Sequence, residues 1–345
     1  REASIPLSPV GPNELAYIQY TSGSTRFPRG VMITQKAVLN NLANIIEHGS
    51  KIRTGDRCAS WLPFYHDMGL VGLVLVPVAA QMSVDYLSTR DFAMRPRLWL
   101  KLMTENRATI SIGPPFGYEL CLQRLRENDI KKFDLSAWRM AGVGAETIRP
   151  EPLLEFAKIL EPCGFNKEAF CACYGMAECS LAVSFAPLYT GLTIDFVNGD
   201  YLSDERRALP VNADAPQSTV RSSRFVNCGI PLPEYEVEIR DAHGCRLPER
   251  HVGTIYVKTA SLMSGYFGDI KLTREVLSAD GWFNTGDLGY LVKDSLFITG
   301  REKDMIIING RNIWPQDLEF AAEQQPKVRI GYASVFSIHG SEGNE

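Results

Sequence analysis

The chain has 345 residues, of which 45% are hydrophobic and 22% are charged, values typical of folded proteins with two or more substructures. Its 36 basic and 40 acidic side chains give a formal net charge of −4, which excludes the basic surface of a nucleic-acid-binding protein and a polybasic membrane patch. The apolar run 70–80 is interrupted by Gly72 and Pro77 and is shorter than the roughly 20 residues of a transmembrane helix, so we expect it to be buried core.

Strands and helices are predicted to alternate through the first half. Apolar and β-branched runs predict strands, and stripes of apolar residues with a spacing of three or four predict helices. The predicted strands are 15–20, 109–112 and 169–174, and the predicted helices are 34–47 with Thr34 as N-cap, one opening at Pro96, and 150–160. This order predicts an α/β fold with a mainly parallel sheet flanked by helices.

The pattern changes after residue 189. Residues 189–224 are polar and show little periodicity. Beyond them, alternation around Val237 and then the runs 253–258, 295–300 and 304–308 predict a smaller β-rich subdomain. A helix is predicted over 315–323 and a last strand over 332–338. We therefore expect an α/β core at 1–225, a β subdomain at 226–302, and a hinge with the start of a further domain at 303–345.

The ends and the cysteines favour a cytoplasmic protein. The first residues, REASIPLSPVGPNE, lack the apolar centre of a signal peptide. The eight cysteines include no C-x-x-C pair, and we interpret them as reduced thiols rather than as disulfides or metal ligands.

A hydroxyl-rich loop follows the first predicted strand. Residues 20–31 read YTSGSTRFPRGV, with four hydroxyls and two glycines. Small residues allow backbone N–H groups to turn inward, and hydroxyls add donors for phosphate oxygens. Arg29 could neutralise part of a triphosphate charge. The loop lacks the G-x-x-x-x-G-K-[ST] pattern, and a loop of this composition alone is more often a turn or linker.

The order of the motifs is more specific than the composition of this loop. TSGST with Pro28 and Gly30 resembles the phosphate loop of the adenylate-forming superfamily, which includes acyl-CoA ligases, peptide-synthetase adenylation domains and luciferases. Further segments resemble the family's other motifs in the same order: FYHDMG at 64–69, YGMAE at 174–178, NTGDLG at 284–289, and GREKD at 300–304 followed by NGR at 309–311. The chain is identified as a member of this superfamily.

Several details resemble the fatty acyl-AMP ligase branch. These are Arg26 in the phosphate loop, PCGF at 162–165, and GRNIWPQDLE at 310–319. The polar stretch 189–224 falls where that branch carries additional sequence, which is held to restrain the C-terminal domain and to disfavour the reaction with CoA.

The resemblance implies ATP and Mg²⁺ as cofactors and a fatty acid as substrate. Adenylyl transfer from ATP to a carboxylate depends on positioning and charge neutralisation, because the carboxylate is already ionised at pH 7. The residues expected to bind nucleotide are Thr21, Ser22, Gly23, Ser24, Thr25, Arg29, Gly144, Ala145, Glu146, Tyr174, Gly175, Met176, Ala177, Asp287 and Arg301.

Thr25, His66, Glu178 and Arg301 are the candidate catalytic residues. Glu178 is the candidate Mg²⁺ ligand, because Mg²⁺ prefers one or two carboxylates together with phosphate oxygens. Asp287 suits the two ribose hydroxyls, because a carboxylate offers two acceptors and no donor. Outside the motif context, Glu178 would be read as a solvated charge and Asp287 as a turn residue.

The acyl side of the site is less specific. By resemblance His66 lies at the mouth of an acyl tunnel, near the carboxylate or the α-phosphate, although a structural histidine among aromatic residues is the alternative. Side chains that could form the tunnel wall or simply pack in the core are Leu70, Leu73, Ile112 and Phe116. Lys303 matches the hinge of the family, and the alternative is a solvated surface lysine.

The resemblance covers the chain from its phosphate loop to its hinge. Whole members of the family carry sequence before this loop and a C-terminal domain after the hinge, so we expect part of a longer polypeptide that binds ATP or acyl-AMP with weak turnover. The expected product passes to an acyl carrier protein or a polyketide or peptide synthase. The alternatives are a fatty acyl-CoA ligase and a nucleotide-binding pseudoenzyme.

Overall fold

A seven-stranded sheet forms the centre of the computed structural model, which describes residues 9–21, 28–211, 221–308, 311–323, 325, 328 and 333–338. Five neighbouring strands of this sheet run parallel, from β7 to β4, and β8 and β11 extend it antiparallel. The strand order is β11 (Ile230–Pro231), β8 (Ala182–Phe185), β7 (Phe170–Gly175), β6 (Met140–Val143), β5 (Ile110–Gly113), β3 (Arg57–Ser60) and β4 (Ser83–Tyr86). The predicted α/β fold with a mainly parallel sheet is confirmed.

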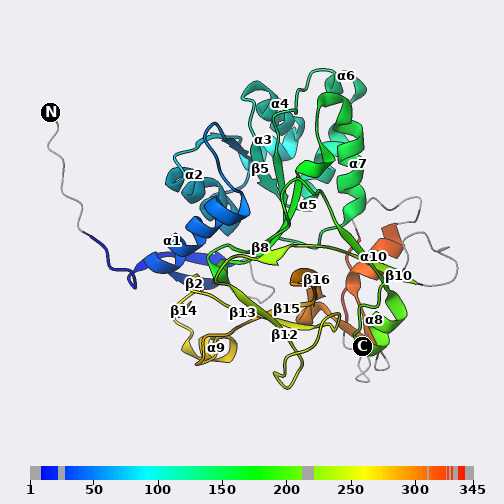
Figure 1. Ribbon diagram of the computed structural model, residues 1–345. Coiled ribbons are helices and arrows are strands. Elements are labelled where there is room, and N and C mark those ends of the chain that lie inside the picture. The colour runs from blue at the N-terminus through cyan, green and yellow to red at the C-terminus, as the bar shows by residue number, and fades with distance from the viewer. Residues whose placement is uncertain are drawn as a thin grey trace.

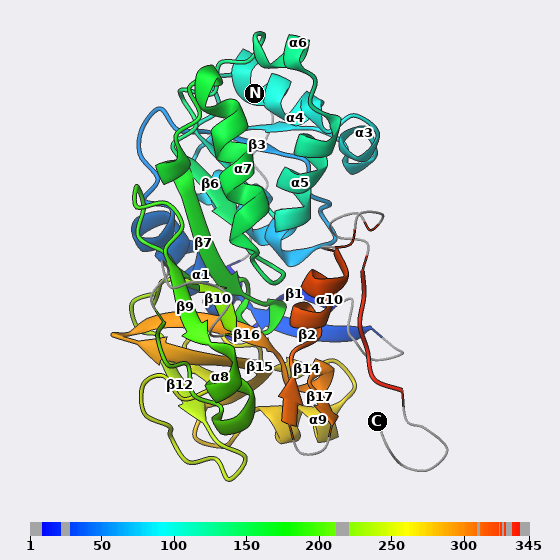
Figure 2. The ribbon, with the colours of Figure 1, turned by 90° about the vertical axis from the view of Figure 1, so that its right-hand side faces the viewer.

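Helices surround the upper part of this sheet (Figures 1 and 2). The first begins at Thr34, whose hydroxyl accepts a hydrogen bond from Ala37 N at 3.2 Å, as the predicted N-cap requires. The helices are α1 (Gln35–Asn44), which continues as a π-helix over Ile45–Gly49; a second π-helix over Met68–Leu75, leading into α2 (Val76–Ala79); and α3 (Thr89–Met94), α4 (Arg97–Glu105), α5 (Pro115–Arg124), α6 (Glu127–Ile130) and α7 (Pro150–Leu160).

Aromatic side chains fill the space between the sheet and these helices. Trp99 lies 5.1 Å from both Tyr118 and Trp138, measured between ring centroids, in edge-on geometry. All three side chains are at most 2% exposed. Edge-on contacts of this kind add to the free energy of burying apolar area, so this cluster fixes the helices against the sheet.

A buried ion pair joins the ends at which three parallel strands begin. Arg139, which precedes β6, donates from Nε to Asp56 Oδ1 at 2.8 Å, and Asp56 precedes β3. Thr109, which precedes β5, donates to the same oxygen at 2.8 Å. Burial by itself would raise the pKa of Asp56, but these hydrogen bonds outweigh it and hold that pKa below its usual range.

Substituting Asp56→Asn is expected to lower the free energy of unfolding by about 3 kcal/mol or more, because it leaves the Arg139 charge buried without its partner. Urea denaturation at pH 7 measures the loss. The lowered pKa means that the ion pair stabilises the fold above the unfolded-state pKa and that this contribution disappears as the pH falls through the folded-state pKa. The difference between the variant and the wild type should therefore shrink in acid.

The matched control is Asp134→Asn, which removes an exposed ion pair with Arg107 Nη1 at 3.3 Å. Because solvent screens this pair, the urea midpoint should stay nearly unchanged. Equal shifts in the two variants would contradict a special role for the buried pair.

Smaller sheets lie below the large one in both ribbon views (Figures 1 and 2). One sheet combines β1 (Leu15–Thr21) and β2 (Arg29–Thr34) with β14 (Gly265–Tyr266), so the start of the chain pairs with a strand more than 200 residues later. A four-stranded antiparallel sheet, the predicted β-rich subdomain, contains β12 (Glu236–Arg240), β13 (Gly253–Lys258), β15 (Phe283–Val292) and β16 (Ser295–Arg301), and α9 (Ile270–Val276) lies beside it.

Residues 189–224 are more regular than their sequence indicates. They contain β9 (Ile194–Asn198), α8 (Gly199–Glu205) and the first part of β10 (Ser222–Val226), whereas residues 212–220 lie outside the described part. Asn198 caps α8 by accepting from Asp200 N at 2.9 Å. The polar pattern does not reveal these elements, because β9 and β10 pair with each other rather than with a neighbouring sheet and so need no long apolar run.

The segment after Arg301 packs against this region. It contains β17 (Ile306–Ile308), β18 (Arg311–Ile313) and α10 (Pro315–Glu323). Asn312 donates to Ser203 O at 2.9 Å, and Trp314 is 3% exposed in a second apolar core with Val197 and Leu202. The strand predicted for 332–338 is wrong for residues 333–338, which form no strand, because no partner strand lies beside them in the described part of the chain.

Candidate active site

The YGMAE motif begins at the end of β7, at the edge of the sheet where the parallel strands finish. Gly175 has no room for a side chain, since a Cβ atom there would lie 2.0 Å from Leu181 O. The chain then turns through Met176, which is partly buried, into a short 3₁₀ helix over Ala177–Cys179. This turn places Glu178 outside the carboxyl end of β7, the usual position of ligand-binding residues in α/β sheets.

Glu178 is largely enclosed and carries a single tyrosine hydrogen bond. Its Oε1 accepts from Tyr266 Oη of β14 at 2.7 Å, and its backbone oxygen accepts from Met263 N at 2.8 Å. Burial raises the pKa of Glu178, and the tyrosine offsets only part of this effect. Among the described residues, no cationic side chain forms an ion pair with it.

Asp287 lies on β15 between an arginine and a tyrosine. Tyr174 Oη donates to Asp287 Oδ2 at 2.7 Å, and Arg301 Nε lies 3.2 Å from Oδ1. Antiparallel pairing of β15 with β16 places Asp287 directly opposite Arg301. Burial raises the pKa of Asp287, against the lowering by Arg301 and Tyr174. The YGMAE, TGD and GREKD motifs therefore meet at this carboxylate.

His66 lies in the FYHDMG segment and is oriented by its neighbour. Its Nδ1 is 2.7 Å from Asp67 Oδ1, and this hydrogen bond raises the pKa of His66 against the effect of burial. With Nδ1 engaged, Nε2 remains to donate to a ligand when the ring is protonated. Gln19 of β1 holds the segment by donating to Tyr65 O at 2.6 Å.

The phosphate loop is described only at its two ends. Thr21 and Arg29 are paired across β1 and β2. Ser22, Gly23, Ser24, Thr25 and Arg26 lie outside the described residues. Arg29 is 5.6 Å from the ring centroid of Tyr266, the tyrosine that donates to Glu178. The base of the loop and Glu178 are thus brought together through one aromatic ring.

The predicted adenine segment follows β6. A Cβ atom on Gly144 would lie 2.7 Å from Cys173 O, so a larger residue would push β6 and β7 apart. Ala145 is exposed and has φ 71°, in the left-handed region. Glu146 Oε1 accepts from Phe116 N at 2.9 Å at the start of α5, where an acidic group is favoured. Glu146 therefore caps a helix, and a contact of these residues with adenine stays a prediction.

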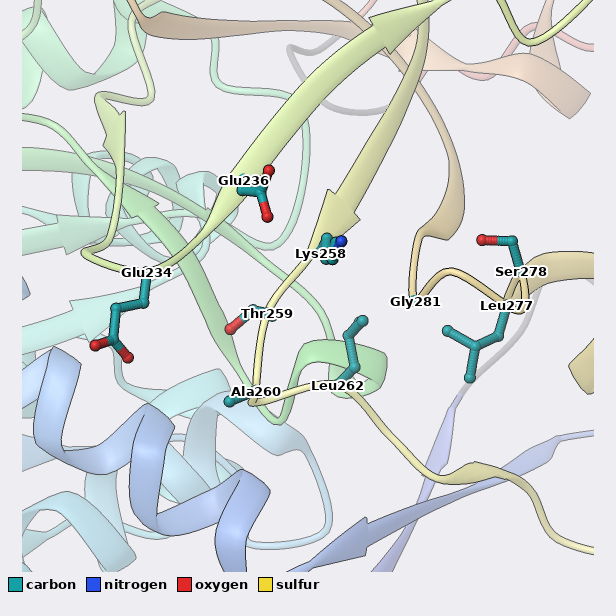
Figure 3. Close-up of a pocket in the computed structure, with 9 residues that line it drawn as sticks. All are labelled: Glu234, Glu236, Lys258, Thr259, Ala260, Leu262, Leu277, Ser278 and Gly281. Carbon is teal, nitrogen blue, oxygen red and sulfur yellow. The ribbon is translucent and has the colours of Figure 1, made fainter.

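The candidate tunnel residues differ in their surroundings. Leu73 and Ile112 belong to the apolar core, Leu70 is half-buried, and Phe116 is 48% exposed beside Trp61. Phe116 thus remains the candidate with a free surface, and the tunnel itself stays a prediction. A pocket of about 440 Å³ lies elsewhere, between the start of β12, the end of β13 with the segment after it, and the segment before β15, and none of its lining residues was predicted as a site residue (Figure 3).

Lys303 lies in a short 3₁₀ helix over Glu302–Asp304 and is exposed. Arg301, immediately before it, is 59% exposed although it pairs with Asp287. Arg301 is thus tied to β15, whereas Lys303 two residues later is exposed. A hinge at Lys303 stays a prediction.

Tyr266 is the site residue that the sequence motifs missed. It is 4% exposed, and its hydroxyl is directed at Glu178, 88 residues earlier in the chain. A sequence signal does exist, because GYFG at 265–268 is a glycine-flanked aromatic pair. The pattern alone does not indicate which residue the hydroxyl contacts.

The charges around Glu178 fit a bound cation. Burial raises the pKa of Glu178, and the nearby carboxylates of Asp67 and Asp287 raise it further. A partly buried carboxylate with one tyrosine donor suits Mg²⁺, which takes one or two protein carboxylates and otherwise phosphate and water oxygens. No cluster of three or more closely placed metal-ligating side chains occurs among the described residues.

In the same part of the chain, no helix is long and apolar enough to cross a membrane.

Comparison with known proteins defines the class. A model of the AMP-binding enzyme family matches residues 2–267. A solved structure from a study of fatty acyl-adenylate ligases of E. coli and L. pneumophila superposes with a TM-score of 0.88 and 53% identity, over 94% of this chain and 58% of that chain. This chain belongs to the AMP-binding enzyme family, which is part of the adenylate-forming superfamily.

Two curated relatives differ in what their names state. A putative acyl-CoA synthetase of Caulobacter vibrioides is 45% identical over 345 residues, which is 100% of this chain and 60% of that protein. JamA of Moorena producens, a medium-chain-fatty-acid–[acyl-carrier-protein] ligase, is 36% identical over 95% of this chain and 56% of that protein. The chain thus spans between 56% and 60% of the length of these relatives.

Proposed function

We propose that this chain carries the nucleotide and acyl sites of an enzyme that converts a fatty acid and ATP into acyl-adenylate and pyrophosphate. The observation that supports the proposal is that Asp287 and Asp67, the residue next to His66, both act on the Glu178 carboxylate, while Tyr174 and Arg301 hold Asp287 and Tyr266 holds Glu178. In the reaction, a carboxylate oxygen forms a bond to the α-phosphorus while the bond from that phosphorus to the bridging oxygen of pyrophosphate breaks.

The residues divide the task of binding and charge neutralisation. Asp287, fixed by Tyr174 and Arg301, accepts hydrogen bonds from the two ribose hydroxyls. Arg29 at the base of the phosphate loop adds positive charge near the leaving pyrophosphate. His66, with its pKa raised by Asp67, donates to the carboxylate or the α-phosphate as charge builds up there.

Glu178 would hold Mg²⁺, which when bound neutralises the charge on the phosphate oxygens. Its partly buried carboxylate, whose charge Asp67 and Asp287 make less favourable, would be stabilised by a cation at this position. Tyr266 fixes one of its oxygens and so orients the other. Arg301 pairs with Asp287 immediately before the proposed hinge at Lys303, so movement of that hinge would change this pair.

We propose an acyl carrier protein, rather than CoA, as the acceptor of the acyl group. The region 189–224 engages the segment that follows the hinge: Asn312 bonds to α8, and Trp314 enters the core that α8 and β9 share. Arg149 adds an ion pair to Glu323 of α10 at 2.5 Å. These contacts limit rotation of whatever follows the hinge, and the carrier-protein ligase among the relatives supports this acceptor.

The test uses the protein at its full length with ATP, Mg²⁺ and a fatty acid. Acyl-AMP and pyrophosphate should form, and acyl transfer to a phosphopantetheinyl carrier protein should exceed transfer to CoA by at least about tenfold, or about 1.4 kcal/mol in barrier height. Rapid formation of acyl-CoA would instead identify an acyl-CoA ligase, as the Caulobacter relative's name suggests. Nucleotide binding without pyrophosphate release would identify a pseudoenzyme.

A further inference from the structure

A buried chain of polar side chains lies behind Glu178 and outside the predicted site. Asn41 of α1, Tyr235 and Ser261 are 0%, 7% and 0% exposed. Asn41 Nδ2 donates to Tyr235 Oη at 2.6 Å, Tyr235 Oη donates to Ser261 Oγ at 2.6 Å, and Ser261 Oγ donates to Asn40 Oδ1 at 2.7 Å. Each hydroxyl accepts one hydrogen bond and donates the next, so all bonds of this network run in one direction. Such a network restrains the backbone segments that it contacts.

This hydrogen-bond network holds the turn that follows Glu178. Ser180 Oγ donates to Ser261 O at 2.9 Å. On the other side, Asn41 Nδ2 donates to Ala182 O at 2.8 Å, and Ala182 N donates to Asn41 Oδ1 at 3.2 Å. One asparagine amide thus replaces a strand neighbour for Ala182, at the first residue of β8. The two ends of the turn are fixed by different members of the same network.

The turn itself is strained. Ser180 has φ 66° and ψ −54°, and Leu181 N donates across it to Cys179 O at 2.8 Å. A three-residue turn of this hand is rarely adopted by a residue with a side chain and persists only where the surroundings over-determine it. The network supplies that restraint, and Met263 N, two residues after Ser261, donates to Glu178 O at 2.8 Å.

We propose that Asn41, Tyr235 and Ser261 are positioning residues for the Glu178 carboxylate. They hold the strained turn behind Glu178 so that its side chain points at the cation that accompanies ATP. This inference rests on the proposed function, in which Glu178 holds Mg²⁺. None of the three residues touches the nucleotide in this assignment; they act through the backbone at Glu178 and Ser180.

The test is Tyr235→Phe, which removes one hydroxyl from the middle of the network and keeps the ring. The measurement is the affinity of this chain for ATP with and without Mg²⁺, and for AMP, by titration calorimetry. The Mg²⁺-dependent gain in ATP affinity should fall about tenfold, because partners that orient metal ligands have effects of this size, while the AMP affinity should stay unchanged.

The matched control is Tyr290→Phe, since Tyr290 is also buried and donates one bond, to Asp195 Oδ2 at 2.8 Å. It should leave the Mg²⁺-dependent gain as in the wild type. If Tyr235→Phe fails to fold, Ser261→Ala serves in its place, because it also interrupts the network.

The outcomes separate the two claims. If the Mg²⁺-dependent gain in ATP affinity is lost in Glu178→Gln but kept in Tyr235→Phe, the positioning role is overturned and the proposed function stays intact. A wild-type chain with no Mg²⁺-dependent gain overturns both. A loss of AMP affinity that parallels the loss of the gain would indicate general damage to the fold and would also contradict the positioning role.

Discussion

Glu178→Gln is expected to reduce acyl-adenylate formation by the full-length protein about 100-fold or more. Glutamine keeps the size of the side chain and an acceptor for Tyr266 Oη, but it removes the charge that we assign to Mg²⁺ binding. The measurement is fatty-acid-dependent release of pyrophosphate at saturating ATP and Mg²⁺.

Glu168→Gln is the control for the loss of a negative charge. Glu168 is an exposed glutamate just before β7, and its substitution should leave the rate unchanged. A Glu178→Gln enzyme that keeps its activity within about threefold of the wild type, a barrier change below about 1 kcal/mol, would show that Glu178 does not hold the metal.

Asp287→Asn is expected to weaken ATP binding to this chain about 100-fold. Two hydrogen bonds to a charged acceptor are lost or reversed, and bonds of this kind contribute about 1.5–3 kcal/mol each. Calorimetry with ATP and with 2′-deoxy-ATP and 3′-deoxy-ATP measures the effect. The wild type should discriminate against both deoxy analogues, and the variant should discriminate much less. Equal discrimination by the two proteins would place the ribose elsewhere.

The fold should not suffer from this substitution. Burial raises the pKa of Asp287, so its ionisation opposes folding: the cost is absent below the unfolded-state pKa of about 3.9 and grows as the pH rises through the folded-state pKa. The melting temperature of Asp287→Asn relative to the wild type should therefore increase between pH 4 and pH 7. A decrease over this range would contradict the raised pKa.

Local sequence patterns were sufficient to predict two strands of the large sheet, at 109–112 and 169–174, and three of the helices that surround it. The predicted helix over 150–160 coincides with α7, and Thr34 caps α1 as expected. These elements depend on periodicity and capping, which act over a few residues. The regular elements of 189–224 escaped prediction because their pairing partners, not their own apolar pattern, stabilise them.

The site was predictable to the level of its motifs and not of its contacts. Resemblance placed Glu178, Asp287 and Tyr174 in one site, and the structure brings Tyr174 and Asp287 to 2.7 Å. The Tyr266 hydrogen bond to Glu178 joins residues 88 positions apart, and the bonds that link Asn41, Tyr235 and Ser261 join residues 194 and 26 positions apart. Such contacts depend on how separate sheets pack, which no local pattern in the sequence encodes.

The central claim is that this chain contains one continuous site for an acyl-adenylate. The most direct measurement is the affinity of the 345-residue chain for a non-hydrolysable acyl-adenosine sulfamate, compared with AMP and with the free fatty acid. Because both halves of the analogue bind in a single site, it should bind at least about 100-fold more tightly than AMP, as analogues of tightly held intermediates do. An affinity no greater than that for AMP would contradict the account.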